Sequence, residues 1–190
     1  MKSHVLAIFS LFAILSGGSY AAEPAERAAN SHRHAHQVDS ELEFLVEMIP
    51  HHQEAVDSAD RIAAITVRQE MRDFAKVVAE LQTREIAMMR EWIERWYPGA
   101  SMEAAYRPMM RELEGMSPEQ ADIAFLEDMI EHHLAAVHMA REVLDKGLAE
   151  HDETKILAGE IIAAQNREID QMREWLDHWR GEVAPAGHGH

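Results

Sequence analysis

The chain has 190 residues, with 13 histidines, 12 methionines and no cysteine, and its formal net charge is −16. A charge this negative repels nucleic acid and anionic lipid and raises the local concentration of cations. The lack of cysteine excludes disulfides and thiolate metal sites, so a site for a soft metal ion would have to use methionine and histidine.

Residues 1–21 have the layout of a secretory signal: Lys2, an apolar run over residues 5–15, and small residues ending at Ala21. The run is shorter than the roughly 20 apolar residues that a membrane span needs. We therefore expect cleavage after Ala21, which changes the net charge to −17 because Lys2 is lost. The mature protein is predicted to be periplasmic and to have no membrane segment.

Two polar segments flank the predicted domain, residues 22–37 and 182–190, and both are expected to be flexible. They contain histidines that could bind Cu(II) loosely at neutral pH, although solvated tails without a role are an equal alternative. These accessory candidates are His32, His34, His36, His188 and His190.

Residues 38–181 are rich in helix-forming side chains, with Pro and Gly at a few breaks. Thr66-x-x-Gln69 has the form of a capping box, and Ser117-Pro118-Glu119-Gln120 combines an N-cap, a first-turn proline and a capping partner. A connection with Met102, Met109, Met110 and Met116 precedes Ser117. Four helices are expected, over about 39–64, 66–97, 117–147 and 152–179.

The two predicted helix pairs are an internal duplication. Residues 44–59 and 125–140 are identical at nine of sixteen positions, and residues 82–96 recur as 165–179. Each hairpin has an apolar stripe that it cannot bury alone, so the two should pack together. The sequence therefore predicts an all-α four-helix bundle built from two duplicated helical hairpins.

A short motif occurs once in each hairpin and places methionine beside paired histidines. The copies are Phe44-Leu45-x-x-Met48-Ile49-x-His51-His52 and Phe125-Leu126-x-x-Met129-Ile130-x-His132-His133. On a helix, each methionine lies one turn from both histidines of its pair. Neutral thioethers and imidazoles suit Cu(I) or Ag(I) better than magnesium, calcium or iron. The motif therefore predicts a site for a soft metal ion.

The partner helices carry a matching stripe that contains a methionine, two tryptophans, a glutamine and a glutamate. Polar side chains on an apolar stripe need hydrogen-bond partners. Histidine ring N–H groups facing them would serve, and would fix the tautomer that leaves the other ring nitrogen for a metal. The polar residues of the stripes are Gln82, Glu85, Gln165 and Glu168, and the methionines are Met89 and Met172.

The sequence was also consistent with other functions to different degrees. A di-iron site needs a carboxylate three residues before each histidine, but Met48, Ile49, Met129 and Ile130 stand there. A haem held between His and Met stays open, as does a helical interaction protein whose buried histidines only bond Glu and Gln. No nucleophile is paired with a base, so no enzyme activity is predicted. His138, His151 and His178 are expected at the surface.

The repeated residues resemble the domain-of-unknown-function 305 family, DUF305, whose bacterial members carry Met-Ile-x-His-His-x-x-Ala-x-x-Met-Ala followed by Gln-x-x-Glu-Ile-x-x-Met. The resemblance covers about residues 38–180 and occurs in both halves. It implies a ferritin-like four-helix bundle, and similarity to periplasmic CopM-type members implies binding of Cu(I) and silver in metal tolerance. A copper efflux pump or another periplasmic copper carrier would then be the partner.

The resemblance also implies which residues are ligands. The last methionine of the family motif is present as Met139 but is replaced by Ser58 in the first half. The first half is therefore expected to bind more weakly, or the two halves to share one asymmetric site. The implied ligands are Met48, His51, His52, Met89, Met129, His132, His133, Met139 and Met172.

Overall fold

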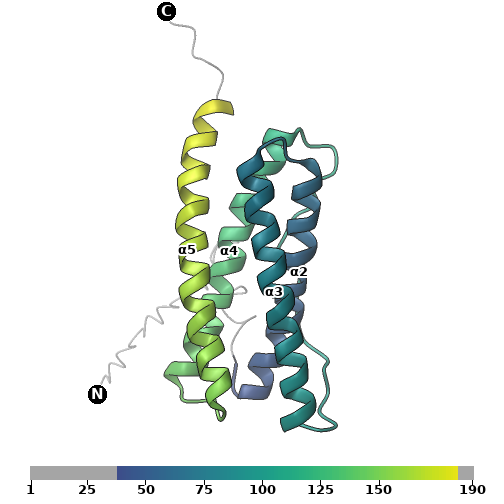
Figure 1. The fold of residues 1–190 in the computed structure, drawn as a ribbon, viewed down its shortest axis with the longest axis vertical. Coiled ribbons are helices and arrows are strands. Elements are labelled where there is room, and N and C mark those ends of the chain that lie inside the picture. Colours follow the sequence, from purple (N-terminus) through teal and green to yellow (C-terminus); the bar gives the residue numbers. More distant parts are fainter. Residues whose placement is uncertain (1–37, 184–190) are drawn as a thin grey trace, which may run out of the picture.

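The computed structural model describes residues 38–183, which form four α-helices with no strand among them (Figure 1). The helices are α2 (Glu41–Ile65), α3 (Gln69–Trp96), α4 (Pro118–Asp145) and α5 (Asp152–Val183). The predictions for the secretory signal and for the histidines of residues 22–37 and 184–190 lie outside the described residues. No helix within residues 38–183 has an apolar stretch long enough to cross a membrane.

The helices form two hairpins that pack against each other (Figure 1). Helix α2 packs along α3, α4 packs along α5, and the hairpins meet through α2 and α4. The start of α2 lies near the end of α4, because the Val38 N–H donates to Glu142 at 3.0 Å. The two central helices are therefore antiparallel, and the duplicated motifs cross near the middle of the bundle. The predicted all-α four-helix architecture is confirmed.

Local capping explains where α2 and α4 begin and where α4 ends. Ser40 caps α2 by accepting the Glu43 N–H at 3.1 Å. Ser117 and Gln120 form the predicted reciprocal capping box, with Pro118 in the first turn of α4. Gly147 follows the end of α4 with a φ of 63°, a left-handed conformation that glycine adopts without strain.

Two predicted helix boundaries are wrong. Thr66 does not cap α3, because it still belongs to the end of α2, where its N–H bonds to Ile62. Its hydroxyl accepts the N–H of Arg68, which is the residue at the N-cap of α3. Helix α5 runs past the predicted end near residue 179 and through Gly181 to Val183. One glycine costs a helix only about 1 kcal/mol, which is too little to end it.

The core consists of two apolar clusters, one toward each end of the bundle. The first contains Phe44 and Leu45 of α2 with residues of the other three helices, and the second contains Phe125 and Leu126 of α4 in the same way. Between them lies a layer of buried polar side chains from all four helices. Buried polar groups are expensive unless they find partners, so this layer is where function is to be sought.

Candidate metal site

Four histidines of α2 and α4 form a single row of imidazoles across the centre of the bundle. The rings of His51 and His132 face each other with centroids 3.7 Å apart and planes 36° apart. His52 lies 6.2 Å from His51, and His133 lies 6.3 Å from His132, between ring centroids. All four side chains have no solvent exposure. The two copies of the motif thus meet at the contact between the hairpins.

A glutamate from a partner helix stands at each end of the row. The His52 Nε2 lies 2.7 Å from a Glu85 carboxylate oxygen, and the His133 Nε2 lies 2.7 Å from Glu168. A carboxylate only accepts, so each Nε2 carries a proton, and in the neutral ring Nδ1 then keeps a lone pair. The Nδ1 atoms of His52 and His133 are buried and have no hydrogen-bond partner in residues 38–183. This is the tautomer that a metal ligand requires.

The two stripe glutamines lie in the same layer but do not make the expected contacts. Gln82 and Gln165 are buried, and their side-chain carbonyl oxygens have no hydrogen-bond partner within residues 38–183. The histidine rings turn to the glutamates, which are charged acceptors and bond more strongly than a neutral amide. The glutamines therefore line the layer without orienting a histidine in this structure.

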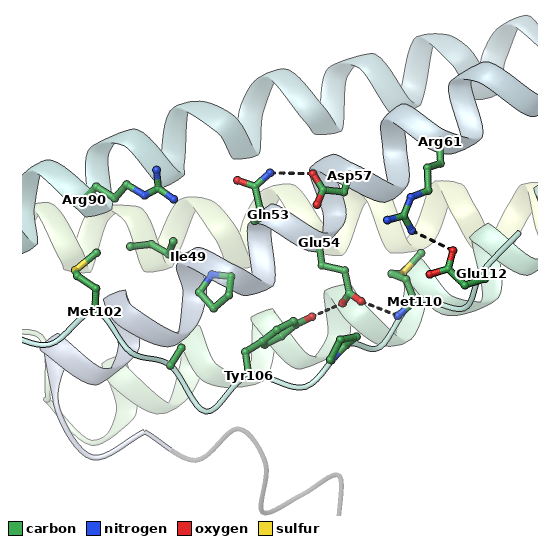
Figure 2. Close-up of a pocket in the computed structure, with 13 residues that line it drawn as sticks. Ile49, Gln53, Glu54, Asp57, Arg61, Arg90, Met102, Tyr106, Met110 and Glu112 are labelled. Carbon is green, nitrogen blue, oxygen red and sulfur yellow. Dashed lines mark hydrogen bonds and ion pairs between the residues drawn. The ribbon is translucent and has the colours of Figure 1, made fainter.

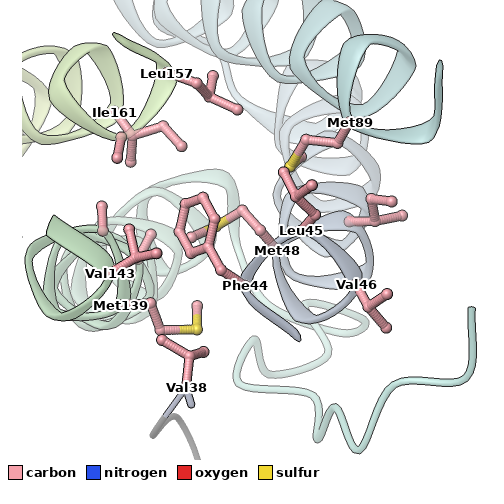
Figure 3. Close-up of a cluster of buried hydrophobic side chains, with 14 of the residues drawn as sticks. Val38, Phe44, Leu45, Val46, Met48, Met89, Met139, Val143, Leu157 and Ile161 are labelled. Atoms are coloured by element: carbon pink, nitrogen blue, oxygen red, sulfur yellow. The ribbon is translucent and has the colours of Figure 1, made fainter. Parts of the chain in front are cut away.

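The candidate methionines are all buried, but they divide unequally between the two clusters. Figure 3 shows Met48, Met89 and Met139 in the first cluster, supplied by α2, α3 and α4. Met129 and Met172 belong to the second cluster. Met139 thus joins the methionines of the opposite half and not those of its own hairpin. Three of the candidate thioethers lie on one side of the histidine row and two on the other.

Two residues at the histidine row were not predicted from the sequence. They are Glu54 of α2 and Tyr106 of the connection between α3 and α4. The Tyr106 hydroxyl donates to Glu54, and both groups lie 3.4 Å from the His132 Nε2. Glu54 occupies the position that Ala135 has in the second repeat. A carboxylate two residues after the paired histidines, where the other repeat has alanine, is the signal that could have identified it.

The electrostatics of this corner favour a neutral histidine. Burial lowers the pKa of His132 from 6.5 to about 4, since it penalises the charged ring. Burial also raises the pKa of Glu54, but hydrogen bonds from His132, Tyr106 and backbone N–H groups outweigh it and bring that pKa to about 2. Burial and the bond to Glu54 raise the pKa of Tyr106. At neutral pH the ring is therefore uncharged beside a carboxylate anion.

Comparison with known proteins places the chain in a family. The model of the family described as "Domain of unknown function (DUF305)" matches residues 41–176, and again residues 122–190. This chain belongs to the DUF305 family. No curated protein matches it.

Solved structures resemble this DUF305 chain over most of its length. CopM in its Cu(I)-bound form is 30% identical with a TM-score of 0.66, covering 75% of this chain and 99% of CopM. CopM co-crystallised with silver is 29% identical with a TM-score of 0.64, covering 75% and 98%. A DUF305 protein from Streptomyces coelicolor is 26% identical with a TM-score of 0.65, covering 72% and 91%. The resemblance seen in the sequence is confirmed at the level of family and fold.

The donor set of this DUF305 protein fits a soft ion. Within residues 38–183, no group of three or more His, Asp or Glu side chains is arranged to hold one metal ion. The buried donors beside the row are neutral imidazole nitrogens and thioether sulfurs, the ligands that Cu(I) and Ag(I) prefer. The Nδ1 atoms of His52, His132 and His133 have no hydrogen-bond partner among the described residues and would gain one bond each from such an ion.

Proposed function

We propose that this protein binds Cu(I), with Ag(I) as its chemical mimic, and sequesters or carries copper in the periplasm as part of copper tolerance. The observation that carries the proposal is the buried row of four imidazoles whose outer members turn an unprotonated Nδ1 away from a glutamate. Structures of CopM in Cu(I)-, Cu(II)- and Ag-bound forms support it, because their fold is the same and their identity is about 30%.

The proposed ligands lie in the polar layer or within two helical turns of it. Glu85 and Glu168 would hold His52 and His133 in the ligand tautomer and raise the basicity of the rings. Thioethers from the apolar clusters would complete the coordination. The ligands are Met48, His51, His52, Met89 and Met139 on one side, with Met129, His132, His133 and Met172 on the other.

Neutral ligands give such a site its selectivity. A Cu(I) ion brings one positive charge into an apolar interior, and soft donors that carry no proton at neutral pH bind it without displacing protons. Because the pKa of His132 is about 4, protonation of this ring does not release the ion near neutral pH. Release is therefore proposed to occur by ligand exchange with a copper efflux pump or another periplasmic carrier.

The test is an anaerobic competition titration of Cu(I) between the protein and bathocuproine. Met48→Leu combined with Met129→Leu removes one thioether from each side and nearly keeps the volume. We expect the Cu(I) affinity of the double variant to fall by at least about tenfold, which is the order of the loss when one metal contact is removed. Met71→Leu is the matched control, because Met71 is fully buried but 11 residues from Gln82, roughly 16 Å along α3.

The result separates metal binding from the alternatives. Equal competition by wild type, the double variant and Met71→Leu would contradict the methionine–histidine site. It would favour an interaction protein in which the histidines only bond their glutamates. A Soret band in the purified protein would favour haem.

A further inference from the structure

The connection between α3 and α4, residues 97–117, lies across the outer face of α2. The Ala105 N–H donates to Glu47 at 2.7 Å, and the Met109 and Met110 N–H groups donate to Glu54 at 3.0 and 3.1 Å. Glu47 and Glu54 are seven residues apart, which places them on the same face of the helix two turns apart. Two carboxylates thus hold the connection against α2 at the level of the histidine row.

Tyr106 is the residue of this connection that reaches the row. Its ring meets His51 edge-on, with centroids 5.8 Å apart and planes 72° apart. Its hydroxyl bonds to Glu54 and lies 3.4 Å from the His132 Nε2. His51 and His132 are fully buried, and Tyr106 with Glu54 covers them on this side of the bundle.

A pocket of about 640 Å³ opens outside this cover (Figure 2). Tyr106 and Glu54 belong to its wall, so one layer of side chains separates the pocket from His132. Met102 and Met110 line it near opposite ends, as Figure 2 shows. Met102 is 46% exposed, so filling a gap in the core does not explain a thioether there.

The charges around the pocket suit a monovalent cation. Arg61 is paired with Glu112 at 3.7 Å, and Arg90 adds a second positive charge to the wall. Glu54 and Asp57 contribute two further carboxylates, so the charges that line the pocket sum to −1. The wall therefore offers a small net negative charge together with two thioether side chains, of which Met102 is exposed and Met110 is partly buried. Sodium and magnesium gain little from thioethers, whereas Cu(I) and Ag(I) bind them well.

We propose that this pocket is the access port of the soft metal ion and that Tyr106, bonded to Glu54, closes it. The ion is captured by Met102 and Met110 and passes to His51 and His132 when the phenol turns away from Glu54. The inference rests on the proposed function, because it assigns the route to that same site. Neither port methionine belongs to the buried ligand set.

The first experiment measures the rate of Cu(I) transfer from its bathocuproine complex to the apo protein by anaerobic stopped-flow absorbance. Tyr106→Phe keeps the ring but loses the bond to Glu54, so we expect uptake to become about five- to tenfold faster at unchanged final affinity. Tyr97→Phe is the matched control, because the Tyr97 hydroxyl donates to Glu41 at 2.6 Å near the start of α2, away from the port. Equal rates for the two variants would overturn the port.

A second pair of variants tests capture independently of the Tyr106 bond. Met102→Leu with Met110→Leu should slow uptake by about tenfold and leave the equilibrium affinity within about twofold, because a transit ligand changes rates and not the final state. Met116→Leu, in the same connection but outside the pocket, should transfer like wild type. An unchanged rate in the double variant would overturn capture at the port. No Cu(I) uptake by any of these proteins would instead reject the proposed function.

Discussion

Met139 and Ser58 occupy equivalent positions of the two repeats and differ in their ability to bind a soft ion. Met139 lies in the cluster of Met48 and Met89, while the cluster of Met129 has no thioether at the corresponding place on α2. The second half of the molecule therefore supplies one sulfur donor, Met139, to the cluster of the first half across the α2–α4 contact. This arrangement favours the second alternative, in which the two halves share one asymmetric site, because Met139 of the second half lies beside Met48 and Met89 of the first.

A double-mutant cycle tests this asymmetry. Met139→Leu should weaken Cu(I) binding by about tenfold, and its effect should be non-additive with Met48→Leu, because ligands of one ion act together. With Met129→Leu the two effects should add. The measurement is the competition titration with bathocuproine for the single and double variants. Additive effects with Met48→Leu and non-additive effects with Met129→Leu would show that Met139 binds with Met129 and not with Met48.

Glu85 is expected to act on the metal through His52. Replacing Glu85 by Gln keeps the shape but removes the charge that polarises the ring, so the Cu(I) affinity should fall by about tenfold. Glu41→Gln is the control, because Glu41 also bonds a histidine at 2.7 Å but does so outside the polar layer. Both variants are measured by the same titration. Equal losses would show a general effect on stability instead of a role at the site.

At the scale of helices, the two ends of the bundle are closed in related ways. At one end the Arg68 guanidinium lies 4.4 Å from the centroid of Trp179 and 3.3 Å from the Asp122 carboxylate. Arg68 precedes α3, Asp122 is near the start of α4, and Trp179 is near the end of α5. One cation–aromatic–carboxylate contact therefore joins three helices.

His151 takes the place of Arg68 at the other end, 83 residues later and just before α5. Its ring stacks on Trp96 at 3.7 Å and 2°, and its Nδ1 lies 2.7 Å from Glu41. Burial raises the pKa of Glu41, but hydrogen bonds from Thr154, Tyr97 and His151 outweigh it and lower that pKa below 4.5. His151 was expected at the surface; its side chain is 32% exposed, but its ring is held by Glu41 and Trp96.

Removal of this ring should destabilise the protein. His151→Ala loses a hydrogen bond to a carboxylate and a stacked contact, worth about 2 kcal/mol together. A loss of that size lowers Tm by roughly 4–8 °C in a domain of this length. His138→Ala, at an exposed position of α4, should leave Tm within about 1 °C because such surface changes are small. Thermal unfolding followed by circular dichroism measures both, and a similar Tm for the two variants would contradict the closing role.

The helices were predictable because their signals are local. Ser117, Pro118 and Gln120 form a cap within four residues, and the repeated stripes report which faces are buried. Thr66 misled the prediction because a capping pattern does not show which of two adjoining helices uses it. A contact between a paired histidine and Glu85 was also predictable, since a buried acid on an apolar stripe requires a hydrogen-bond partner.

The cover over the histidine row was not predictable in the same way. Tyr106 and Glu54 are 52 residues apart, and residues 97–117 have no periodicity that indicates a face. Their contact depends on where the whole connection crosses α2, which is set by long-range hydrogen bonds to Glu47 and Glu54. The position of Met139 in the cluster of the first half likewise depends on the antiparallel crossing of α2 and α4.

At the scale of the whole molecule, the polar layer divides the apolar core into two clusters. Burial of its polar side chains costs folding free energy, which hydrogen bonds within the layer must offset. Glu85 bonds His52 at one end of the row, Glu168 bonds His133 at the other, and Glu54 lies beside its centre. Three buried or half-buried carboxylates thus lie within 3.4 Å of a histidine ring nitrogen. The stability of the bundle should consequently respond to acid.

The expected pH dependence follows from the sign of each shift. The pKa of His132 falls from 6.5 to about 4 on folding, so the unfolded chain takes up a proton first and stability decreases as the pH falls from about 6.5 to 4. By linkage the loss is on the order of 3 kcal/mol. The pKa of Glu54 is about 2 instead of 4.5, so a second loss follows below pH 4.5. Urea unfolding of the apo protein between pH 7.5 and 4 measures the first loss.

The control for this prediction is His132→Gln, which removes the titrating ring and leaves the other charges unchanged. Acid also relieves the repulsion within a chain of net charge −16, but that relief acts on wild type and variant alike. The difference between their unfolding free energies therefore isolates His132. Wild type should lose stability relative to the variant as the pH falls from 6.5 to 4. A difference that stays constant over this range would mean that the ring keeps its ordinary pKa, and the neutral row of imidazoles would lose its physical basis.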